Sequence, residues 1–248
     1  MPQPAAAIFD LDGTVVDNMH LHAEAFGAFA TRHGLPPLAP ADRVKLDGRR
    51  NSEIFPILFG RAMDREEWLA YEEEKEGLYR ELSKGRLTPL PGLVRLLDLL
   101  ARLEVPVALA TSAPGPNVVH TLAEIGLTAR FPVVVRGDQV RRGKPAPDVF
   151  LVSAQRLHVP ASGCLVFEDA PVGITAAHAA GMRCVAVTTT FSAAHLAARP
   201  EPPEAAFADF AAFLALVTRD WSAGLDEFCN SRPPSPCGLR RDIAPQRA

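Results

Sequence analysis

The sequence predicts an α/β protein that combines a doubly wound parallel sheet with an all-helical insertion. Short runs rich in Val, Ile and Ala recur along the chain, and each is followed by a turn and a segment of helical periodicity. The first run ends near Phe9 and the second begins near Pro106, and the residues between them show only helical patterns. With 248 residues, 48% of them hydrophobic, the chain can form one or two domains with a full core.

Strands and helices alternate in the part of the chain that is predicted to form the sheet. Because strands that alternate with helices build a parallel sheet covered on both faces, this pattern is that of a Rossmann-like core. The strands are expected at 5–9, 106–110, 133–135, 164–167 and 184–187. The helices that follow are expected at 92–103, 116–125, 147–157 and 171–181.

The helical insertion is predicted to occupy residues 17–87. Two stretches that could act as hinges bound it, at 14–17 and at 83–92, and the second contains the Gly and Pro residues of SKGRLTPLPG. Within the insertion, helices are expected at 18–33, 40–48, 51–62 and 65–83.

The remaining residues divide into a core and a tail. The core is assigned to 1–16 and 88–220. The tail, 221–248, has little apolar content and much Pro, so we expect it to be disordered.

Composition argues against several classes of partner. A formal net charge of −3 without long blocks of like charge disfavours nucleic-acid and anionic-membrane binding. The apolar runs are far shorter than the roughly 20 residues that cross a bilayer, and the first residues lack the features of a signal peptide. The cysteines show no CxxC pairing, which favours a reducing compartment. We therefore expect a cytoplasmic protein, a monomer or weak homodimer, that acts on a small molecule.

An acidic pair, Asp10 and Asp12, directly follows the first predicted strand. Side chains two apart on a strand share a face, and ligands bind at the carboxyl ends of strands in doubly wound sheets. Two carboxylates in one crevice repel each other, so the pair suits a bound divalent cation, with one carboxylate as nucleophile and the other as acid/base. Taken alone, such a pair is more often part of a solvated turn.

A second acidic pair, Glu168 and Asp169, follows the predicted strand 164–167 and precedes a helix. A parallel sheet would bring this pair close to the first one, and together they offer the hard oxygen ligands that Mg²⁺ prefers. An equally frequent meaning of Glu-Asp at this position is a helix cap that complements the helix dipole.

Two further positions could serve a phosphoryl group. Thr111 and Ser112 follow a predicted strand, where hydroxyl and backbone N–H donors face the crevice, although such residues are usually helix caps. Lys144 lies between a glycine and two prolines just ahead of a helix and offers a positive charge at a fixed place. A lysine at such a position is more commonly an ordinary surface residue.

The four motifs in this order resemble those of the haloacid dehalogenase superfamily, over residues 5–218. The insertion after the first motif is similar to the cap domain of the β-phosphoglucomutase-like branch, and the core segment VFEDAPVGITAAHAAGM at 166–182 also resembles that branch. The resemblance implies a Mg²⁺-dependent phosphatase or phosphotransferase whose substrate is a small phosphorylated metabolite such as a sugar phosphate.

The resemblance also implies a role for each motif residue. Asp10 would be the nucleophile that becomes an aspartyl phosphate, and Asp12 would be the general acid/base. Mg²⁺ would be bound by Asp10, Asp169 and the backbone carbonyl of Asp12, and Glu168 would act on the metal from beyond its direct ligands. The residues implied to hold the phosphoryl oxygens are Thr111, Ser112 and Lys144.

Six residues of the insertion are candidates for substrate specificity. Asn18 and His22 are four apart and would share a helix face, although a lone histidine is more often a core or surface residue. The segment Gly48-Arg49-Arg50-Asn51 lies where the family carries its substrate loop, and its arginines could bind an anionic or hydroxyl-rich group or could be solvated. The full set is Asn18, His22, Arg49, Arg50, Asn51 and Lys75.

The resemblance leaves several activities open. Lys75 matches a lysine of the mutase pattern, but Asp47 and Asn51 stand where those mutases carry basic residues, which favours a phosphatase over a sugar-phosphate mutase. Halide displacement would leave Asp12 and the second acidic pair idle. Phosphonate hydrolysis through a lysine Schiff base would need Lys45 or Lys75, and no motif supports it. A non-catalytic binding role would leave all these chemical groups unused.

Overall fold

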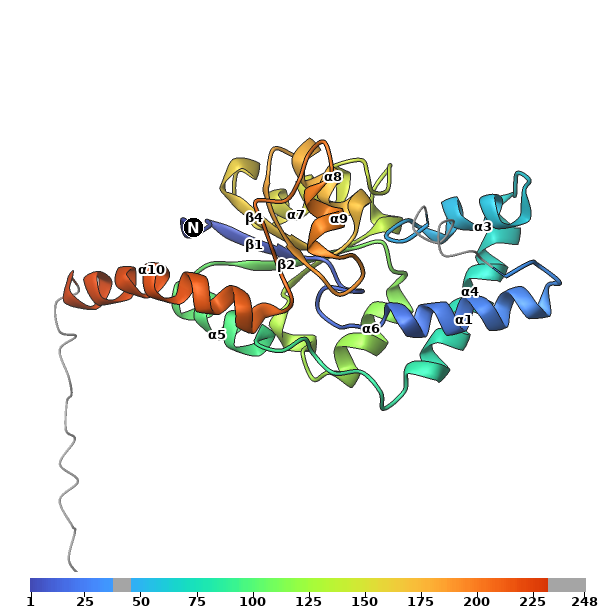
Figure 1. The fold of residues 1–248 in the computed structure, drawn as a ribbon, viewed down its shortest axis with the longest axis horizontal. Helices are drawn as coiled ribbons and strands as arrows, with labels where there is room; N and C mark the ends of the chain where they lie inside the picture. The colour runs from blue at the N-terminus through green and yellow to red at the C-terminus, as the bar shows by residue number, and fades with distance from the viewer. Residues whose placement is uncertain (38–45, 232–248) are drawn as a thin grey trace, which may run out of the picture.

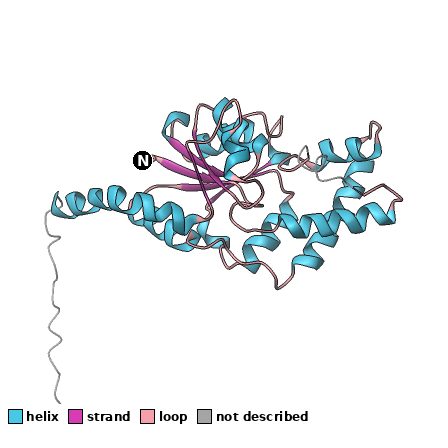
Figure 2. Ribbon diagram, viewed as in Figure 1, coloured by secondary structure: helices cyan, strands magenta, loops and turns pink. Residues whose placement is uncertain are grey.

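The fold is an α/β sandwich around a six-stranded parallel sheet, as the sequence predicts (Figures 1 and 2). It comes from a computed structural model that describes residues 1–37 and 46–231. The strand order is β3-β2-β1-β4-β5-β6, and every pairing is parallel. The strands are β1 (Ala6–Phe9), β2 (Val107–Thr111), β3 (Val133–Arg136), β4 (Cys164–Glu168), β5 (Arg183–Val187) and β6 (Ala205–Phe207).

Helices cover both faces of the sheet, as they do in a doubly wound fold (Figure 1). On one face lie α5 (Leu93–Arg102), α6 (Gly115–Glu124) and α10 (Phe210–Ser231). On the other face lie α7 (Asp148–Arg156), α8 (Pro171–Ala179) and the short α9 (Ala193–Ala197). Three 3₁₀ turns complete the described core: η1 (Thr128–Arg130), η2 (Gly137–Gln139) and η3 (Ala161–Gly163).

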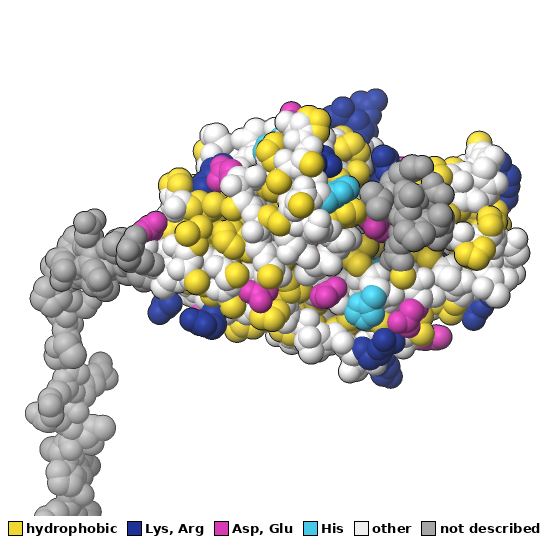
Figure 3. Space-filling view, viewed as in Figure 1, with side chains coloured by type: hydrophobic (Ala, Val, Ile, Leu, Met, Phe, Trp, Pro, Cys, Tyr) yellow, Lys and Arg dark blue, Asp and Glu magenta, His cyan; other side chains and the backbone are white. Residues whose placement is uncertain are grey.

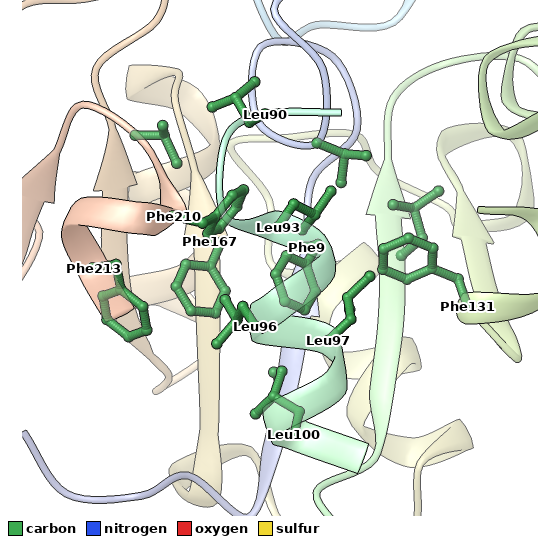
Figure 4. Close-up of a cluster of buried hydrophobic side chains, with 14 of the residues drawn as sticks. Phe9, Leu90, Leu93, Leu96, Leu97, Leu100, Phe131, Phe167, Phe210 and Phe213 are labelled. Atoms are coloured by element: carbon green, nitrogen blue, oxygen red, sulfur yellow. The ribbon is translucent and has the colours of Figure 1, made fainter. Parts of the chain in front are cut away.

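Side chains that alternate along β1 build both halves of the core. Ala7 and Phe9 belong to the cluster under α5 and α10, whereas Ala6 and Ile8 belong to the cluster under α7 and α8. Figure 4 shows the first cluster, in which the ring of Phe9 stacks on that of Phe167 with 4.7 Å between centroids. The central strand is therefore buried on both sides, and its carboxyl end is held firmly in place.

The insertion forms a separate group of helices at one side of the sheet (Figure 1). It contains α1 (Met19–Arg32), α3 (Asn51–Phe59) and α4 (Arg65–Ser83), and α1 and α3 each pack against α4. The helix expected at 40–48 lies mostly outside the described residues, and its described end, 46–48, is a turn.

The two segments that connect the insertion to the sheet run side by side. Val16 forms an isolated antiparallel bridge with Pro89, and the N–H of Leu90 donates to the carbonyl of Val15 at 2.9 Å. These contacts lie within the stretches that the sequence suggests as hinges.

The C-terminal helix differs from the expectation for the tail. α10 continues to Ser231, whereas disorder is predicted from 221 onward. Trp221 explains its ordered part, because its indole is buried against Phe213 and its N–H donates to the carbonyl of Met1 at 2.9 Å. The expectation for 232–248 lies outside the described residues.

No helix in the described part of the chain is long and apolar enough to cross a membrane. On the face drawn in Figure 3, charged side chains of both signs are scattered among hydrophobic and neutral ones.

Candidate active site

The carboxyl ends of three neighbouring strands bring the sequence motifs together. Asp10 directly follows β1, Thr111 is the last residue of β2, and Glu168 is the last residue of β4. Because β1 pairs with both β2 and β4, residues more than a hundred positions apart in the chain meet at this edge. Asp10, Thr111, Glu168 and the adjacent Asp169 are all buried.

Lys144 lies between two of these carboxylates. Its Nζ atom is 2.6 Å from Oδ1 of Asp10 and 2.7 Å from Oε1 of Glu168, and the lysine side chain is buried. Burial alone would lower the pKa of Lys144, but the two carboxylates outweigh it and raise the pKa. The lysine is therefore a fixed positive charge at the strand ends and not a solvated surface residue.

Glu168 has donors on both of its carboxylate oxygens. Oε1 accepts from Lys144, and Oε2 accepts from the backbone N–H groups of Asp169 at 2.8 Å and Ala170 at 2.7 Å. Gly173 makes room for this arrangement, since a Cβ atom there would overlap the Glu168 carboxylate. Glu168 thus connects β4, the start of α8 and Lys144.

Three carboxylates form a cluster with the chemistry of a magnesium site. Asp10, Glu168 and Asp169 each place an oxygen within 4.8 Å of the others. Burial, opposed by the charge of Lys144, raises the pKa of Asp10 to about 7, and burial with the neighbouring Glu168 raises the pKa of Asp169 well above its usual range. A divalent cation would neutralise this excess negative charge, and hard carboxylate oxygens are the ligands that Mg²⁺ prefers.

Gly13 allows the chain to turn tightly beside Asp169. Its φ of +80° lies in the left-handed region, and a Cβ atom there would overlap the Asp169 carboxylate. Asp169 accepts hydrogen bonds from the hydroxyl groups of Thr14, at 3.2 Å, and Thr190. These contacts fix the direction in which Asp169 presents its oxygens.

Asp12 turns away from the cluster and toward the insertion. Its Oδ1 atom accepts a hydrogen bond from Nδ2 of Asn18 at 2.6 Å and lies 3.5 Å from Nε2 of His22. Burial would raise the pKa of Asp12, but these contacts with His22 and Asn18 outweigh it and lower the pKa. The same asparagine, which directly precedes α1, accepts from the N–H of Gly13 at 3.1 Å, so it fixes the conformation of the first motif.

Lys75 contacts His22 on the side of Asp12 that faces the insertion. The Nζ atom of Lys75 is 2.9 Å from Nδ1 of His22 and 2.9 Å from Oε1 of Glu76, and the imidazole of His22 stacks on the ring of Tyr79. His22 and Lys75 line the pocket, whereas the buried Asn18 directly precedes α1 and is not among the lining residues. The specificity roles of these residues stay predictions.

Arg49, Arg50 and Asn51, at the start of α3, have different contacts. Asn51 is buried and donates to Glu76 at 2.7 Å and Glu72 at 3.1 Å. Arg49 lines the pocket, but Arg50 donates to the carbonyl of Gly137 at 3.3 Å and pairs with Glu53, so it contacts the core beside the pocket.

A pocket lies between the strand ends and the insertion. Its walls include both acidic motifs, the end of β2 and side chains from α1, α3 and α4. Of the residues singled out in the sequence, those that line it are Asp10, Asp12, His22, Arg49, Asn51, Lys75, Thr111, Ser112 and Asp169.

Four residues that contact the motif residues or line the pocket were not predicted from the sequence: Glu76, Tyr79, Asn117 and Thr190. The spacing of Lys75 and Tyr79, four residues apart on α4, could have identified the tyrosine. Asn117 and Thr190 carry no local signal, because only tertiary packing brings them to the site.

Comparison with known proteins gives consistent matches. Residues 7–187 match the family described as haloacid dehalogenase-like hydrolases. The phosphorylated carbohydrates phosphatase of Thermotoga maritima is 34% identical over 182 residues, which make up 71% of this chain and 82% of that protein. The β-phosphoglucomutase of Bacillus subtilis is 32% identical over 191 residues, covering 73% of this chain and 82% of the mutase.

Solved structures agree with these matches. A hydrolase of the haloacid dehalogenase family IA, variant 3, from Entamoeba histolytica superimposes with a TM-score of 0.76 at 28% sequence identity. The alignment covers 83% of this chain and 93% of that one.

Proposed function

The chain belongs to the haloacid dehalogenase-like hydrolases, in the branch similar to β-phosphoglucomutase, and from this premise we propose that it is a Mg²⁺-dependent phosphatase of small phosphorylated metabolites, sugar phosphates among them. Membership of this family, with relatives named as phosphatases, makes it a phosphoric monoester hydrolase. The observation that carries the proposal is the contrast between Asp10, which lies among charged groups at the strand ends, and Asp12, which faces the insertion.

Asp10 is the proposed nucleophile. Its oxygen attacks phosphorus in line, the bond from phosphorus to the ester oxygen breaks, and the phosphoryl group passes to Asp10 as an aspartyl phosphate. Lys144 holds Asp10 in place and supplies positive charge beside it. Most of the acceleration of the reaction would come from this positioning and from the neutralisation of charge.

Asp12 is the proposed acid/base. It takes up a proton when the negative charge of the substrate arrives and gives that proton to the departing ester oxygen. It then removes a proton from the water that attacks the aspartyl phosphate, which releases inorganic phosphate and restores Asp10. Asn18 and His22 would hold its carboxylate in position through both steps.

Asp10, Asp169 and the backbone carbonyl of Asp12 are proposed to hold Mg²⁺. When bound, the ion would neutralise charge on the phosphoryl oxygens and the carboxylates. Glu168 would support the site indirectly, because both its oxygens already accept from Lys144 and backbone N–H groups.

Thr111, Ser112 and Lys144 are the proposed phosphate-binding residues. The Thr111 oxygen accepts from the N–H of Ala113 at 3.0 Å, which leaves its own hydrogen available for a phosphoryl oxygen. The Ser112 hydroxyl donates to the carbonyl of Gly48 at 2.7 Å, so its side chain ties the loop of the insertion to the core.

We propose that residues 17–87 act as a cap that covers the substrate, with the cap residues named in the sequence analysis contributing specificity. The cytoplasm is the proposed location, supported by Cys164 and Cys184, which are buried free thiols. A monomer or weak homodimer remains the proposed assembly.

The second candidate is a sugar-phosphate mutase, which the similarity to the Bacillus subtilis enzyme favours. The test is phosphate release from an aryl phosphate and a panel of sugar phosphates, with and without Mg²⁺. The panel includes β-glucose 1-phosphate with and without a bisphosphate primer. A phosphatase releases phosphate in proportion to substrate consumed, whereas a mutase returns an isomeric sugar phosphate and needs the primer.

A further inference from the structure

A buried polar face of the core helix α6 packs against α4 of the insertion. Asn117 and Thr121 are four residues apart on α6, so they lie on one face of the helix, and they are 1% and 0% exposed. Buried polar side chains destabilise a protein unless they are paired. The partners of these two residues therefore indicate what this face of α6 does.

Asn117 uses both ends of its amide to bind α4. Its Oδ1 atom accepts from Nη1 of Arg80 at 3.0 Å, and its Nδ2 atom donates to Oε2 of Glu76 at 2.7 Å. Because a guanidinium only donates and a carboxylate only accepts, the two partners fix the orientation of the amide. One side chain of the core thus joins a cation and an anion that lie about one turn apart on the insertion.

Glu76 in turn holds Lys75. Its Oε1 atom accepts from Nζ of Lys75 at 2.9 Å and from Nδ2 of Asn51 at 2.7 Å. The same Nζ atom is 2.9 Å from Nδ1 of His22. An ammonium group only donates, so Nδ1 of His22 accepts and the neutral imidazole carries its hydrogen on Nε2.

The hydrogen on Nε2 of His22 lies beside Asp12. Nε2 is 3.5 Å from Oδ1 of Asp12, and it has no hydrogen-bond partner in the described part of the chain. A good N–H···O hydrogen bond needs a separation of about 3.2 Å or less. A shift of a few tenths of an ångström in His22 therefore decides how well it binds the proposed acid/base.

A second path leads from α6 to the other partner of Asp12. The hydroxyl oxygen of Tyr79 is 3.4 Å from Oγ1 of Thr121 and accepts from Nδ2 of Asn18 at 2.6 Å. The ring of Tyr79 stacks on the imidazole of His22, with 3.8 Å between centroids. Both side chains that contact Asp12 are thus supported by residues that α6 holds.

From these contacts we infer that Asn117 is a positioning residue for the acid/base step. It holds Glu76 and, through Glu76 and Lys75, sets the distance between His22 and Asp12. The inference rests on the proposed function, because it concerns the reaction of the same site. Asn117 takes no part in bond making or breaking, and its effect is largest where the departing oxygen needs a proton.

The experiment measures kcat/KM for a series of substituted phenyl phosphates of similar size, with the full chain and Mg²⁺. Esters of weakly acidic phenols need a proton from Asp12 as the phenol leaves, whereas esters of strongly acidic phenols do not. The slope of log kcat/KM against the pKa of the phenol therefore measures the acid step. A general loss of docking lowers every value by the same factor and leaves this slope unchanged.

Asn117→Asp keeps the shape and the bond from Arg80, but it places a second carboxylate against Glu76. We expect kcat/KM to fall about tenfold for the poorest leaving group, because a misplaced acid loses part of a contribution of about 100-fold or more. For the best leaving group the fall should be less than about twofold, so the slope steepens. An unchanged slope in a folded Asn117→Asp protein would overturn the inference.

Glu76→Gln added to Asn117→Asp exchanges the donor and the acceptor. The new amide on α4 can donate to the new carboxylate on α6, while its oxygen still accepts from Lys75, and the pair keeps the charge of the wild type. We expect this double variant to recover most of the wild-type slope. A double variant with the slope of Asn117→Asp alone would contradict the path through Glu76, and the inference with it.

Ser83→Ala is the matched control, because Ser83 also joins α4 to α6. Its Oγ atom is 2.8 Å from Nε2 of His120, and this contact belongs to neither path to Asp12. We expect Ser83→Ala to change kcat/KM for all esters by one common factor and to keep the wild-type slope. A slope as steep as that of Asn117→Asp would show that any loss of docking has this effect, and it would overturn the inference.

If Asn117→Asp fails to fold, Arg80→Met decides. The side chain of Arg80 is partly exposed, and its loss frees the amide of Asn117 to turn away from Glu76, so the slope should steepen in the same direction. An unchanged slope would overturn the inference. A wild-type protein that releases no phosphate from any ester would overturn the proposed function, whereas hydrolysis with one slope for all folded variants would overturn the inference alone.

Discussion

Asp10 and Asp12 lie two residues apart, yet their carboxylates have different partners. Oδ1 of Asp10 accepts from Nζ of Lys144 at 2.6 Å, whereas Oδ1 of Asp12 accepts from Nδ2 of Asn18 at 2.6 Å. The environments move the two pKa values apart, raising that of Asp10 to about 7 and lowering that of Asp12. Two carboxylates with separate environments can take separate chemical roles.

Asp10→Asn should reduce turnover to below about one hundredth of the wild-type rate, because the amide keeps the shape of the side chain but lacks the attacking anionic oxygen. Steady-state phosphate release measures this, with a thermal melt to show that the fold is retained. The matched control is Asp98→Asn, an exposed aspartate of α5 that pairs with Arg130, and it should keep full activity. Substantial activity in Asp10→Asn would exclude Asp10 as nucleophile.

Mg²⁺ should raise the melting temperature of the wild-type protein. Binding to the native state alone adds about 2.7 kcal/mol at a hundredfold excess over Kd. In Asp169→Asn the increase in melting temperature should occur only at higher Mg²⁺ concentrations. At those concentrations the activity of the variant should be partly recovered. If Asp169 did not bind the ion, Asp169→Asn would keep the Mg²⁺ titration of the wild-type protein.

Without divalent cations, the contribution of Asp10 to stability should fall as pH rises from about 4 to about 7. Burial raises the pKa of Asp10 from 3.8 to about 7, so this group binds more protons in the native state than in the unfolded state in this window. Its contribution to the free energy of unfolding then decreases with pH. Asp10→Asn removes this contribution, so the difference in melting temperature between variant and wild type should grow toward pH 7. A difference in melting temperature that stays constant with pH would contradict the raised pKa of Asp10.

Arg49 and Arg50 should give different kinetic effects, although they are adjacent. Arg49 lines the pocket, so Arg49→Ala should raise KM for a sugar phosphate and leave a small aryl phosphate nearly unaffected. Arg50 contacts the carbonyl of Gly137, so Arg50→Ala should weaken the docking of the insertion and slow both substrates. If Arg49→Ala and Arg50→Ala had the same effects on the sugar phosphate and on the aryl phosphate, the separate roles assigned to these arginines would be wrong.

Phe167→Ala should destabilise the fold by about 3–5 kcal/mol, because it removes a buried ring that stacks on Phe9 and contacts Phe213. Chemical denaturation measures the change. Val119→Ala is the control: that side chain is 69% exposed, and its loss should cost less than about 0.5 kcal/mol. Similar losses in the two variants would contradict the placement of Phe167 in the core.

The predicted strands match the observed ones closely because each is a compact apolar run between turns. β6 was missed, since Ala205–Phe207 is short and its alanines carry no strand signal. α10 was not predicted, and the disordered tail was predicted to begin too early, at 221, because the contacts of Trp221 with Phe213 and Met1 join distant parts of the chain. Local patterns cannot report such contacts.

The core motifs of the site were foreseen because the ends of parallel strands must meet at one edge. The spacing of Asn18 and His22 suggested that both lie near the crevice, but their contacts with Asp12 were not predicted. The insertion residues were harder, because their roles depend on how the insertion sits on the sheet: Arg50 was expected at the substrate, yet it contacts Gly137.

The central claim is that the phosphoryl group passes through Asp10, and the most direct test is to trap it there. Asp12→Ala keeps the nucleophile and removes the proposed base, so an aryl phosphate, whose leaving group needs no acid, should react once and stall. Intact-mass measurement after rapid quenching should then show one added phosphoryl group, mapped to Asp10 and absent from the Asp10→Asn/Asp12→Ala double variant. A label on another residue, or single-turnover release of phosphate with no labelled protein, would contradict the account.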